Sequence, residues 1–230
     1  VSMPEKNVVR FSDDVSFVQG AFFEPATVAL HGLERTDYKG GKTVAILGGG
    51  TVGMMTMQWA KIFGAKKVVV FDIVDERLDL AKRLGGDAGI NTKEEGFMEK
   101  AKELTDGRGF DYVFETAGNT ITMKMAFELA ANKADVCFIG TPTRELTFTV
   151  DEWENMNRKE FRLTGSWMSY SPPFPGHEWE LTAHYFGTGE LKFDDSFVYK
   201  IQPLSGIAEA FEWFKTPGTV KGKVLIDSEK

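Results

Sequence analysis

Short apolar runs alternate with amphipathic stretches along most of this 230-residue chain. Residues 43–47 (Thr-Val-Ala-Ile-Leu) and 68–71 (Val-Val-Val-Phe) are nearly continuous apolar runs, which are typical of strands buried on both faces of a parallel sheet. Between them, residues 52–63 place apolar side chains at helical spacing. A strand, a helix and a second strand in this order predict a βαβ unit.

The same alternation continues through most of the chain. The predicted strands span residues 42–47, 67–71, 88–91, 110–115, 134–139 and 161–166. The predicted helices among them span residues 26–35, 51–63, 75–84, 94–104, 121–131 and 151–158. We therefore predict an α/β fold with a doubly wound, parallel, six-stranded sheet.

A glycine-rich turn, Gly48-Gly49-Gly50-Thr51-Val52-Gly53, joins the first predicted strand to its helix. In a dinucleotide-binding turn the first glycine permits the tight bend, the second leaves the backbone open to a pyrophosphate, and the third lets the helix pack closely on the strand. The helix N-terminus adds free N–H groups and a partial positive charge. The turn predicts a Rossmann fold whose phosphate-binding residues are Gly48, Gly50, Thr51, Val52 and Gly53.

An acid at the end of the second predicted strand supports this interpretation. Asp72 lies about 20 residues beyond the last glycine, where a carboxylate accepts hydrogen bonds from the adenosine ribose hydroxyls. Because this carboxylate would repel a 2′-phosphate, Asp72 predicts NAD rather than NADP. The alternative is an ordinary glycine-rich turn, which would not require the strand, helix and acid found around it.

The two ends of the chain follow a different pattern. Residues 7–17 are predicted to be extended chain with turns, similar to the end of a β-rich domain. Beyond Trp167 we expect a loop at residues 171–176, helices at residues 178–186 and 204–214, and a final strand at residues 223–227.

Composition narrows the class of protein. Hydrophobic residues make up 42% of the chain, enough for a sizeable core, and the net charge of −7 argues against nucleic acid as a partner. No apolar run approaches the roughly 20 residues that span a bilayer, and no signal peptide is visible. The single cysteine, Cys137, excludes a disulfide framework and a cysteine-rich zinc site within this chain. We therefore expect a cytoplasmic protein that binds neither nucleic acid nor membranes.

Several motifs resemble segments of the zinc-containing medium-chain dehydrogenases. They are residues 21–31 (Ala-Phe-Phe-Glu-Pro-Ala-Thr-Val-Ala-Leu-His), residues 115–118 (Glu-Thr-Ala-Gly), residues 138–142 (Phe-Ile-Gly-Thr-Pro) and a tryptophan- and proline-rich stretch at residues 165–180. The last stretch is similar to the polyol-phosphate branch of the family. The resemblance implies oxidation of a polyol or polyol phosphate, such as galactitol 1-phosphate, to a ketose by zinc-assisted hydride transfer to NAD, with sorbitol or threonine as alternative substrates.

The resemblance also implies a domain organisation. Residues 1–33 would be a remnant of a β-rich, GroES-like catalytic domain with a connecting helix, residues 34–168 the NAD-binding Rossmann domain, and residues 169–230 the C-terminal helices and the return to the catalytic domain. Most zinc ligands would then lie in an N-terminal part outside this sequence, so the chain alone is expected to be inactive, and the sequence identifies no catalytic residue. The alternatives are an NAD(H)-binding module without activity and a structural partner without a cofactor.

Further site residues follow from the resemblance. Glu24 would be a zinc ligand, or would only favour the start of its helix; Arg77 would contact the adenosine ribose, or would be a solvated helix charge. The residues implied to line the nicotinamide side are Thr116, Ala117, Gly118, Gly140, Thr141, Ser166, Trp167 and Met168. Trp167 could equally be a core aromatic, and His31 is interpreted as a structural residue. The sequence shows no basic cluster that can be assigned to a substrate phosphate.

The sixth predicted strand suggests an assembly. Residues 161–166 would lie at an edge of the sheet, and an exposed apolar edge strand is an association surface unless something covers it. We predict a homodimer through the region from about Trp153 to Trp167, since family members pair their sheets near this edge. A covered edge would leave a monomer instead.

Overall fold

The computed structural model describes residues 2–169, 172–216 and 218–229. Its main sheet consists of β1 (Thr43–Leu47), β2 (Lys67–Asp72), β3 (Ala88–Asn91), β4 (Phe110–Glu115), β5 (Ala130–Phe138) and β6 (Arg162–Gly165). These strands are all parallel, in the order β3-β2-β1-β4-β5-β6. This is the order of a doubly wound sheet, so the predicted fold class is confirmed.

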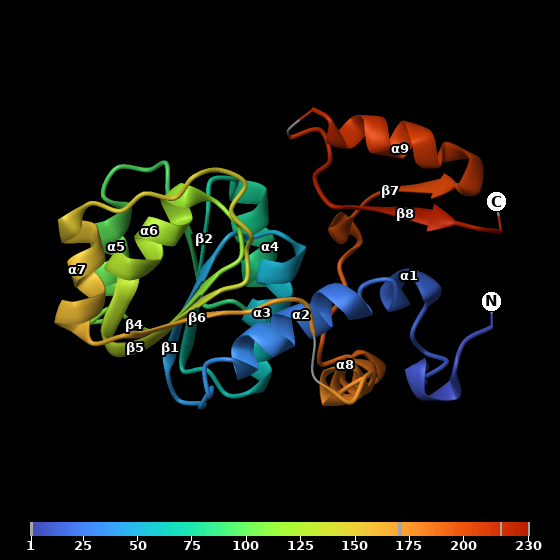
Figure 1. Cartoon of the computed structure of the whole chain (residues 1–230), viewed down its shortest axis with the longest axis horizontal. Coiled ribbons are helices and arrows are strands. Elements are labelled where there is room, and N and C mark those ends of the chain that lie inside the picture. The colour runs from blue at the N-terminus through green and yellow to red at the C-terminus, as the bar shows by residue number, and fades with distance from the viewer. Residues whose placement is uncertain (1, 170–171, 217, 230) are drawn as a thin grey trace.

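Helices cover both faces of this sheet (Figure 1). One layer contains α2 (Phe23–Glu34), α3 (Thr51–Ile62) and α4 (Asp75–Arg83), and the other contains α5 (Phe97–Glu103), α6 (Thr120–Leu129) and α7 (Val150–Lys159). Alternate strand residues divide between two cores: Val44 and Ile46 pack toward the first layer, and Ala45 and Leu47 toward the second. The strands are continuously apolar in sequence because both faces of the sheet are buried.

Two of the element boundaries that differ from the predictions have an identifiable physical reason. The helix predicted from residue 94 begins at Phe97, because the preceding Gly96 adopts a left-handed conformation with φ of +76°. The strand predicted from residue 134 already begins at Ala130, directly after α6, since Ala130 pairs with Phe110 before the register shifts. Pairing with β4, which the local pattern does not show, thus set the start of β5.

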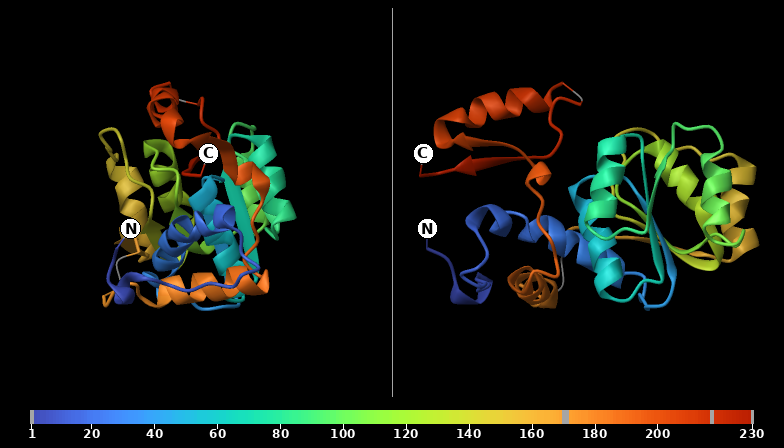
Figure 2. Two further views of the ribbon diagram at one scale, coloured as in Figure 1. Left: turned by 90° about the vertical axis from the view of Figure 1, so that its right-hand side faces the viewer. Right: turned by 180° about the vertical axis from the view of Figure 1, so that it is seen from behind.

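The C-terminal part forms a second unit beside the first (Figure 2). After α8 (His177–Thr188) and a 3₁₀ turn (Asp195–Phe197), β7 (Val198–Pro203) pairs in parallel with β8 (Lys223–Asp227), and α9 (Ile207–Phe214) connects them through a 3₁₀ turn (Leu204–Gly206). The strand β7 was not predicted, because its partner strand β8 lies 20 or more residues away and its polar residues interrupt the apolar pattern.

The N-terminal segment contains no strand among its described residues. A 3₁₀ turn (Glu5–Asn7) and a loop precede the short helix α1 (Phe17–Gly20), which was not predicted. Its signal in the sequence is a capping box: the Ser16 side chain accepts from the Gln19 N–H, and the Gln19 side chain accepts from the Ser16 N–H.

The only cysteine is a core residue, as its apolar surroundings in the sequence indicated. Cys137 on β5 is fully buried, and burial raises the pKa of its thiol to about 12. Within the described residues, none of the helices has both the length and the apolar character needed to cross a bilayer.

Candidate functional site

The register of the sheet brings five strand ends into one row. Across the sheet, the Cα partners run Phe71, Leu47, Glu115, Phe138 and Gly165. The glycine turn follows Leu47, and the two loops predicted to line a nicotinamide follow Glu115 and Phe138. The strand order reverses between β1 and β4, which is where open α/β sheets bind their ligands.

The glycine turn has the geometry that its sequence predicts. Gly48 has φ of +104°, and Gly50 is the N-cap of α3, which receives no side-chain cap. A Cβ built on Gly50 meets no atom of the described residues within 4 Å, whereas a Cβ on Gly53 would lie 1.9 Å from the Gly48 carbonyl oxygen. The turn is therefore closed on the strand side at Gly53 and open to a ligand at Gly50.

Asp72 holds the turn from the neighbouring strand. Its carboxylate is nearly buried, with Oδ2 accepting from the Gly49 N–H at 2.6 Å and Oδ1 from the N–H groups of Ile73 and Val74 at 2.8 and 3.0 Å. Arg77 approaches Oδ2 with Nη1 at 3.4 Å. Three backbone N–H groups and one guanidinium thus surround the carboxylate of Asp72. The hydrogen bond from Gly49 means that Asp72 also stabilises the turn, which the sequence did not show.

A second buried carboxylate organises the next loop, and sequence reasoning included it only as part of a motif. Glu115 Oε1 accepts from the Ala117 and Gly118 N–H groups at 2.9 and 3.0 Å and from the Thr122 hydroxyl at 2.7 Å. Burial raises the pKa of Glu115, while these donors act in the opposite direction. Its position at the end of a strand, just before a glycine-containing loop, was the available signal.

The two loops predicted to line the nicotinamide side lie together. The Thr116 hydroxyl donates to the carbonyls of Leu47 and Gly48, both at 3.0 Å, and so joins the first loop to the glycine turn. A Cβ on Gly140 would lie 2.2 Å from the Gly118 nitrogen, and a Cβ on Gly118 would lie 2.5 Å from the Thr141 carbonyl oxygen. This close backbone contact places Ala117 and its neighbours beside the second loop.

The third predicted segment follows β6. Trp167 is 67% exposed, so the core-aromatic alternative is wrong for this structure. Met168 is 56% exposed and has φ of +55°, and the Ser166 hydroxyl is buried without a hydrogen-bond partner in the described part of the chain. Tyr170 and Ser171, which belong to the tryptophan- and proline-rich stretch, lie outside the described residues.

Glu24 lies in the first turn of α2 with its side chain exposed to solvent. The helix begins at Phe23, three residues before the predicted start at residue 26. Among the described residues, Glu24 belongs to no group of three or more histidine, cysteine, aspartate or glutamate side chains close enough to hold a metal ion. The described residues therefore do not form a zinc site around Glu24, and no reaction step is assigned to zinc in this chain.

Two of the histidines, His31 and His177, contact glutamates that are distant in the sequence. His31 forms a hydrogen bond to the buried Glu178 at 2.9 Å, in agreement with its structural interpretation. His177 contacts Glu34 at 2.7 Å, and this hydrogen bond raises the pKa of His177. Each pair joins residues more than 140 positions apart, so only the packing of α2 and α8 brings them together.

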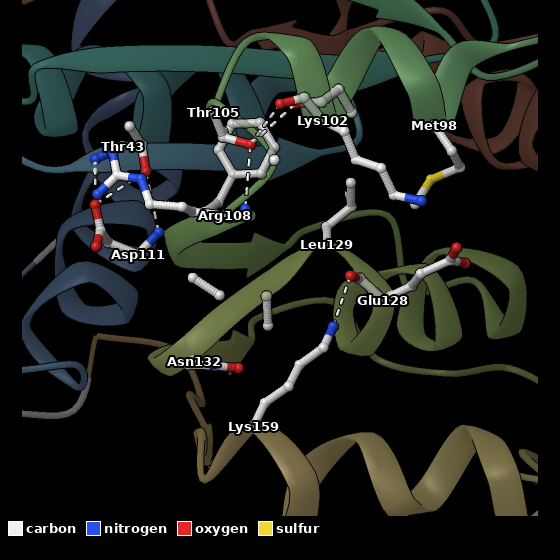
Figure 3. Close-up of a pocket in the computed structure, with 16 residues that line it drawn as sticks. Thr43, Met98, Lys102, Thr105, Arg108, Asp111, Glu128, Leu129, Asn132 and Lys159 are labelled. Atoms are coloured by element: carbon white, nitrogen blue, oxygen red, sulfur yellow. Dashed lines mark hydrogen bonds between the residues drawn. The ribbon is translucent and has the colours of Figure 1, made fainter.

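A cavity of about 480 Å³ lies at the opposite edge of the sheet (Figure 3). It adjoins the amino ends of β1, β4 and β5, including Thr43 and Ala130. Figure 3 shows Lys159 reaching Glu128, where Nζ donates to the carbonyls of Phe127 and Glu128 at the end of α6. This cation therefore caps a helix, and the cavity is separate from the glycine turn.

The strand order, the open glycine turn and the acid beside it define a nucleotide-binding domain of the Rossmann type. The family model described as zinc-binding dehydrogenase matches residues 51–184, which is more than half of the chain. The chain belongs to this zinc-binding dehydrogenase family, a group of oxidoreductases.

Known relatives agree with this assignment. Galactitol 1-phosphate 5-dehydrogenase of Escherichia coli (strain K12) is 33% identical over 98% of this chain, and sorbitol dehydrogenase of Bacillus subtilis (strain 168) is 34% identical over 63% of it, with 41% of that protein covered. The crystal structure of galactitol-1-phosphate dehydrogenase from Escherichia coli superposes with a TM-score of 0.87 at 32% identity, covering 98% of this chain. A Sinorhizobium meliloti 1021 dehydrogenase structure bound to NADP matches with a TM-score of 0.81 at 26% identity, covering 97% of this chain and 63% of that one. The chain spans 65% of the length of the galactitol 1-phosphate enzyme.

Proposed function

We propose that this chain binds NAD(H) and orients it for hydride transfer in a zinc-dependent dehydrogenase. The observation that carries the proposal is the open space at Gly50, directly at the uncapped N-terminus of α3. The free N–H groups and the helix dipole favour the pyrophosphate there. Asp72 lies one strand away and receives the adenosine ribose, with Arg77 beside it.

The nicotinamide end is proposed to lie across the adjoining loops. Their backbones meet through Gly118 and Gly140, so they form one continuous border next to the glycine turn. The residues proposed to line this side are Thr116, Ala117, Gly118, Gly140, Thr141, Ser166, Trp167 and Met168. Glu115 and the Thr116 hydroxyl hold the border rigid through the bonds described above.

For the whole protein we propose oxidation of a polyol or polyol phosphate to a ketose. The extensive match to galactitol 1-phosphate 5-dehydrogenase supports this substrate class, and sorbitol or threonine is the alternative within the family. Zinc would polarise the substrate alcohol. Glu24 is proposed as one zinc ligand, with the others outside this chain, so the chain alone should bind NAD(H) without oxidising alcohols.

The proposed domain organisation divides the chain into residues 1–33, 34–168 and 169–230, with the first and last parts belonging to a catalytic domain. Support comes from the exposed apolar side chains of the second unit, among them Leu204, Phe211 and Phe214 at 58–69% exposure. Such a surface is typical of an interface with a further domain. A cytoplasmic location is proposed with the same function.

Cofactor preference tests the role of Asp72. Replacing Asp72 with Ser should weaken NAD binding roughly 10- to 100-fold, as expected when a charged hydrogen-bond partner is lost, and should strengthen NADP binding. Because the Gly49 N–H loses its acceptor as well, the melting temperature should fall. Calorimetric titration with both cofactors measures the preference.

Glu76→Gln is the matched control for this experiment. It removes one negative charge from the first turn of α4 without changing the carboxylate beside the glycine turn. Its NAD:NADP preference should equal that of the wild type. Equal affinity of the wild type for NAD and NADP would show that Asp72 does not select the cofactor.

We further propose a homodimer formed at the edge strand β6. Among the described residues this strand pairs with β5 alone, and Leu163 and Trp153 are 38% and 45% exposed. Leu163→Lys places a charge on the edge, which natural sheets use to prevent pairing. We expect light scattering at micromolar concentrations to give twice 25.6 kDa for the wild type and 25.6 kDa for this variant.

The control for this variant is Ile121→Lys, which adds the same charge at a 68% exposed position on α6. This variant should remain a dimer. A wild-type mass of 25.6 kDa across the concentration range would contradict the proposed assembly.

A further inference from the structure

Two histidines and two glutamates gather where α2 packs against α8. His31 and Glu34 come from the second half of α2, and His177 and Glu178 form the first turn of α8. His31 Nδ1 lies 2.9 Å from Glu178 Oε1, while the His177 ring lies 2.7 Å from Glu34 Oε1 and 3.6 Å from Glu178 Oε2. Two imidazoles and two carboxylates thus lie in alternation along the contact between α2 and α8.

The spacing of three of these side chains suits a metal ion. One ligand atom from each of His31, Glu34 and Glu178 lies within 4.8 Å of the others. Two ligand atoms on a tetrahedral ion, each about 2.0–2.1 Å from it, are roughly 3.4 Å apart, and the 4.8 Å limit that holds these three atoms is not far above that separation. His31 and Glu34 are three residues apart on one helical face, the spacing from which helical bundles build metal centres.

Burial and chemistry favour a divalent cation. The Glu178 side chain is fully buried, and buried carboxylates either pair with other groups or coordinate metal ions. Mixed imidazole and carboxylate ligands suit zinc or cobalt better than magnesium or calcium. The Glu34 side is half-buried and gives an entry path, whereas His31 and Glu178 form the closed side.

A further buried group lies next to the cluster along α8. Thr182 follows Glu178 by one helical turn and so shares its face of the helix. Its hydroxyl is fully buried and has no hydrogen-bond partner within the described ranges of the chain. A water molecule bound to an ion in the cluster would offer this hydroxyl a partner.

We propose that His31, Glu34 and Glu178 form a site for a transition-metal dication that clamps α2 to α8. The site is distinct from the zinc proposed at Glu24. Glu24 lies seven residues before His31, which is roughly 10 Å along the helix axis. The role of the clamp is structural: it holds the helix that carries Glu24 against α8.

Cobalt binding tests the site directly. The purified chain is stripped with a chelator and titrated with Co²⁺, whose visible absorption bands report imidazole and carboxylate ligation. We expect one equivalent to bind, with a rise in melting temperature, because an ion that binds only the folded state stabilises it. NAD binding should not change, since the cluster is separate from the glycine turn.

Two variants locate the ion. Glu34→Gln removes a half-buried ligand while keeping the shape of the side chain, and should weaken Co²⁺ binding at least roughly 10- to 100-fold. His31→Gln should abolish it, with circular dichroism as the check on folding because Glu178 would lose its partner. His184→Gln is the control and should bind Co²⁺ like the wild type.

Three further results of the Co²⁺ experiments would contradict the proposed metal site. If the wild type takes up no Co²⁺ at tens of micromolar metal, the cluster is a hydrogen-bonded chain only. If Glu34→Gln folds and binds Co²⁺ as tightly as the wild type, or if His184→Gln abolishes binding, the ion lies elsewhere and the proposal fails.

Discussion

Replacing Gly50 with valine should reduce NAD affinity at least roughly 100-fold, about 2.7 kcal/mol, while the protein remains folded. The space around a Cβ at this position is open in the structure, and the φ of −76° suits any residue. The branched side chain would occupy the place where the pyrophosphate must approach the first N–H groups of α3. The cost to folding should be only about 1 kcal/mol, because glycine is a better N-cap than valine.

Calorimetric titration with NAD and chemical denaturation together measure these two effects. Gly187→Ala on α8 is the control, since a Cβ there meets only Ser12 at 3.4 Å and lies on a different helix. It should leave NAD affinity unchanged. Wild-type NAD affinity in folded Gly50→Val would mean that the dinucleotide does not occupy this turn, and the proposed function would lose its main support.

Replacing Gly53 with alanine should instead affect mainly the stability of the protein. We expect the free energy of unfolding to fall by about 3 kcal/mol. The new Cβ would lie 1.9 Å from the Gly48 carbonyl oxygen and 2.8 Å from the Thr116 hydroxyl. The first atom belongs to the backbone of the tight turn, so neither rotation nor a small shift of one side chain relieves the contact. The helix α3 must move away from β1, which disturbs the core beneath it.

A loss of stability would point to the close contact at Gly53, because a glycine-to-alanine change inside a helix ordinarily stabilises a protein by up to about 1 kcal/mol. Urea denaturation of Gly53→Ala beside Gly50→Ala gives the comparison, and the second variant should lie within about 1 kcal/mol of the wild type. A Gly53→Ala protein as stable as the wild type would show that the helix and strand are not in the close contact described here.

Most of the sheet could be predicted because its signals are local. Strands buried on both faces, such as β1 and β2, are apolar throughout, and their helices show one apolar stripe each. Two strand features that escaped prediction depend on distant partners. The strand β7 exists through its pairing with β8, and β5 begins at Ala130 because of its pairing with Phe110.

The candidate site divides in the same way. The glycine turn and Asp72 lie within one βαβ unit, so their spacing along the chain is also their spacing in space. Three other contacts depend on how neighbouring strands align. They are the hydrogen bond from the Gly49 N–H to Asp72, the hydrogen bonds from the loop N–H groups to Glu115, and the contact between Gly118 and Gly140. Residue types alone did not show these contacts.

The sequence by itself determined the Rossmann fold class, the glycine turn proposed to bind phosphate and the acid proposed to receive a ribose, because each depends on short-range periodicity or on backbone freedom at single glycines. Only the tertiary structure decided which polar groups meet. It left Trp167 exposed, and it brought His31 and Glu34 to the first turn of α8, more than 140 residues away. Such contacts come from the packing of whole helices and strands, which buries apolar surface first and sets polar pairs as a consequence.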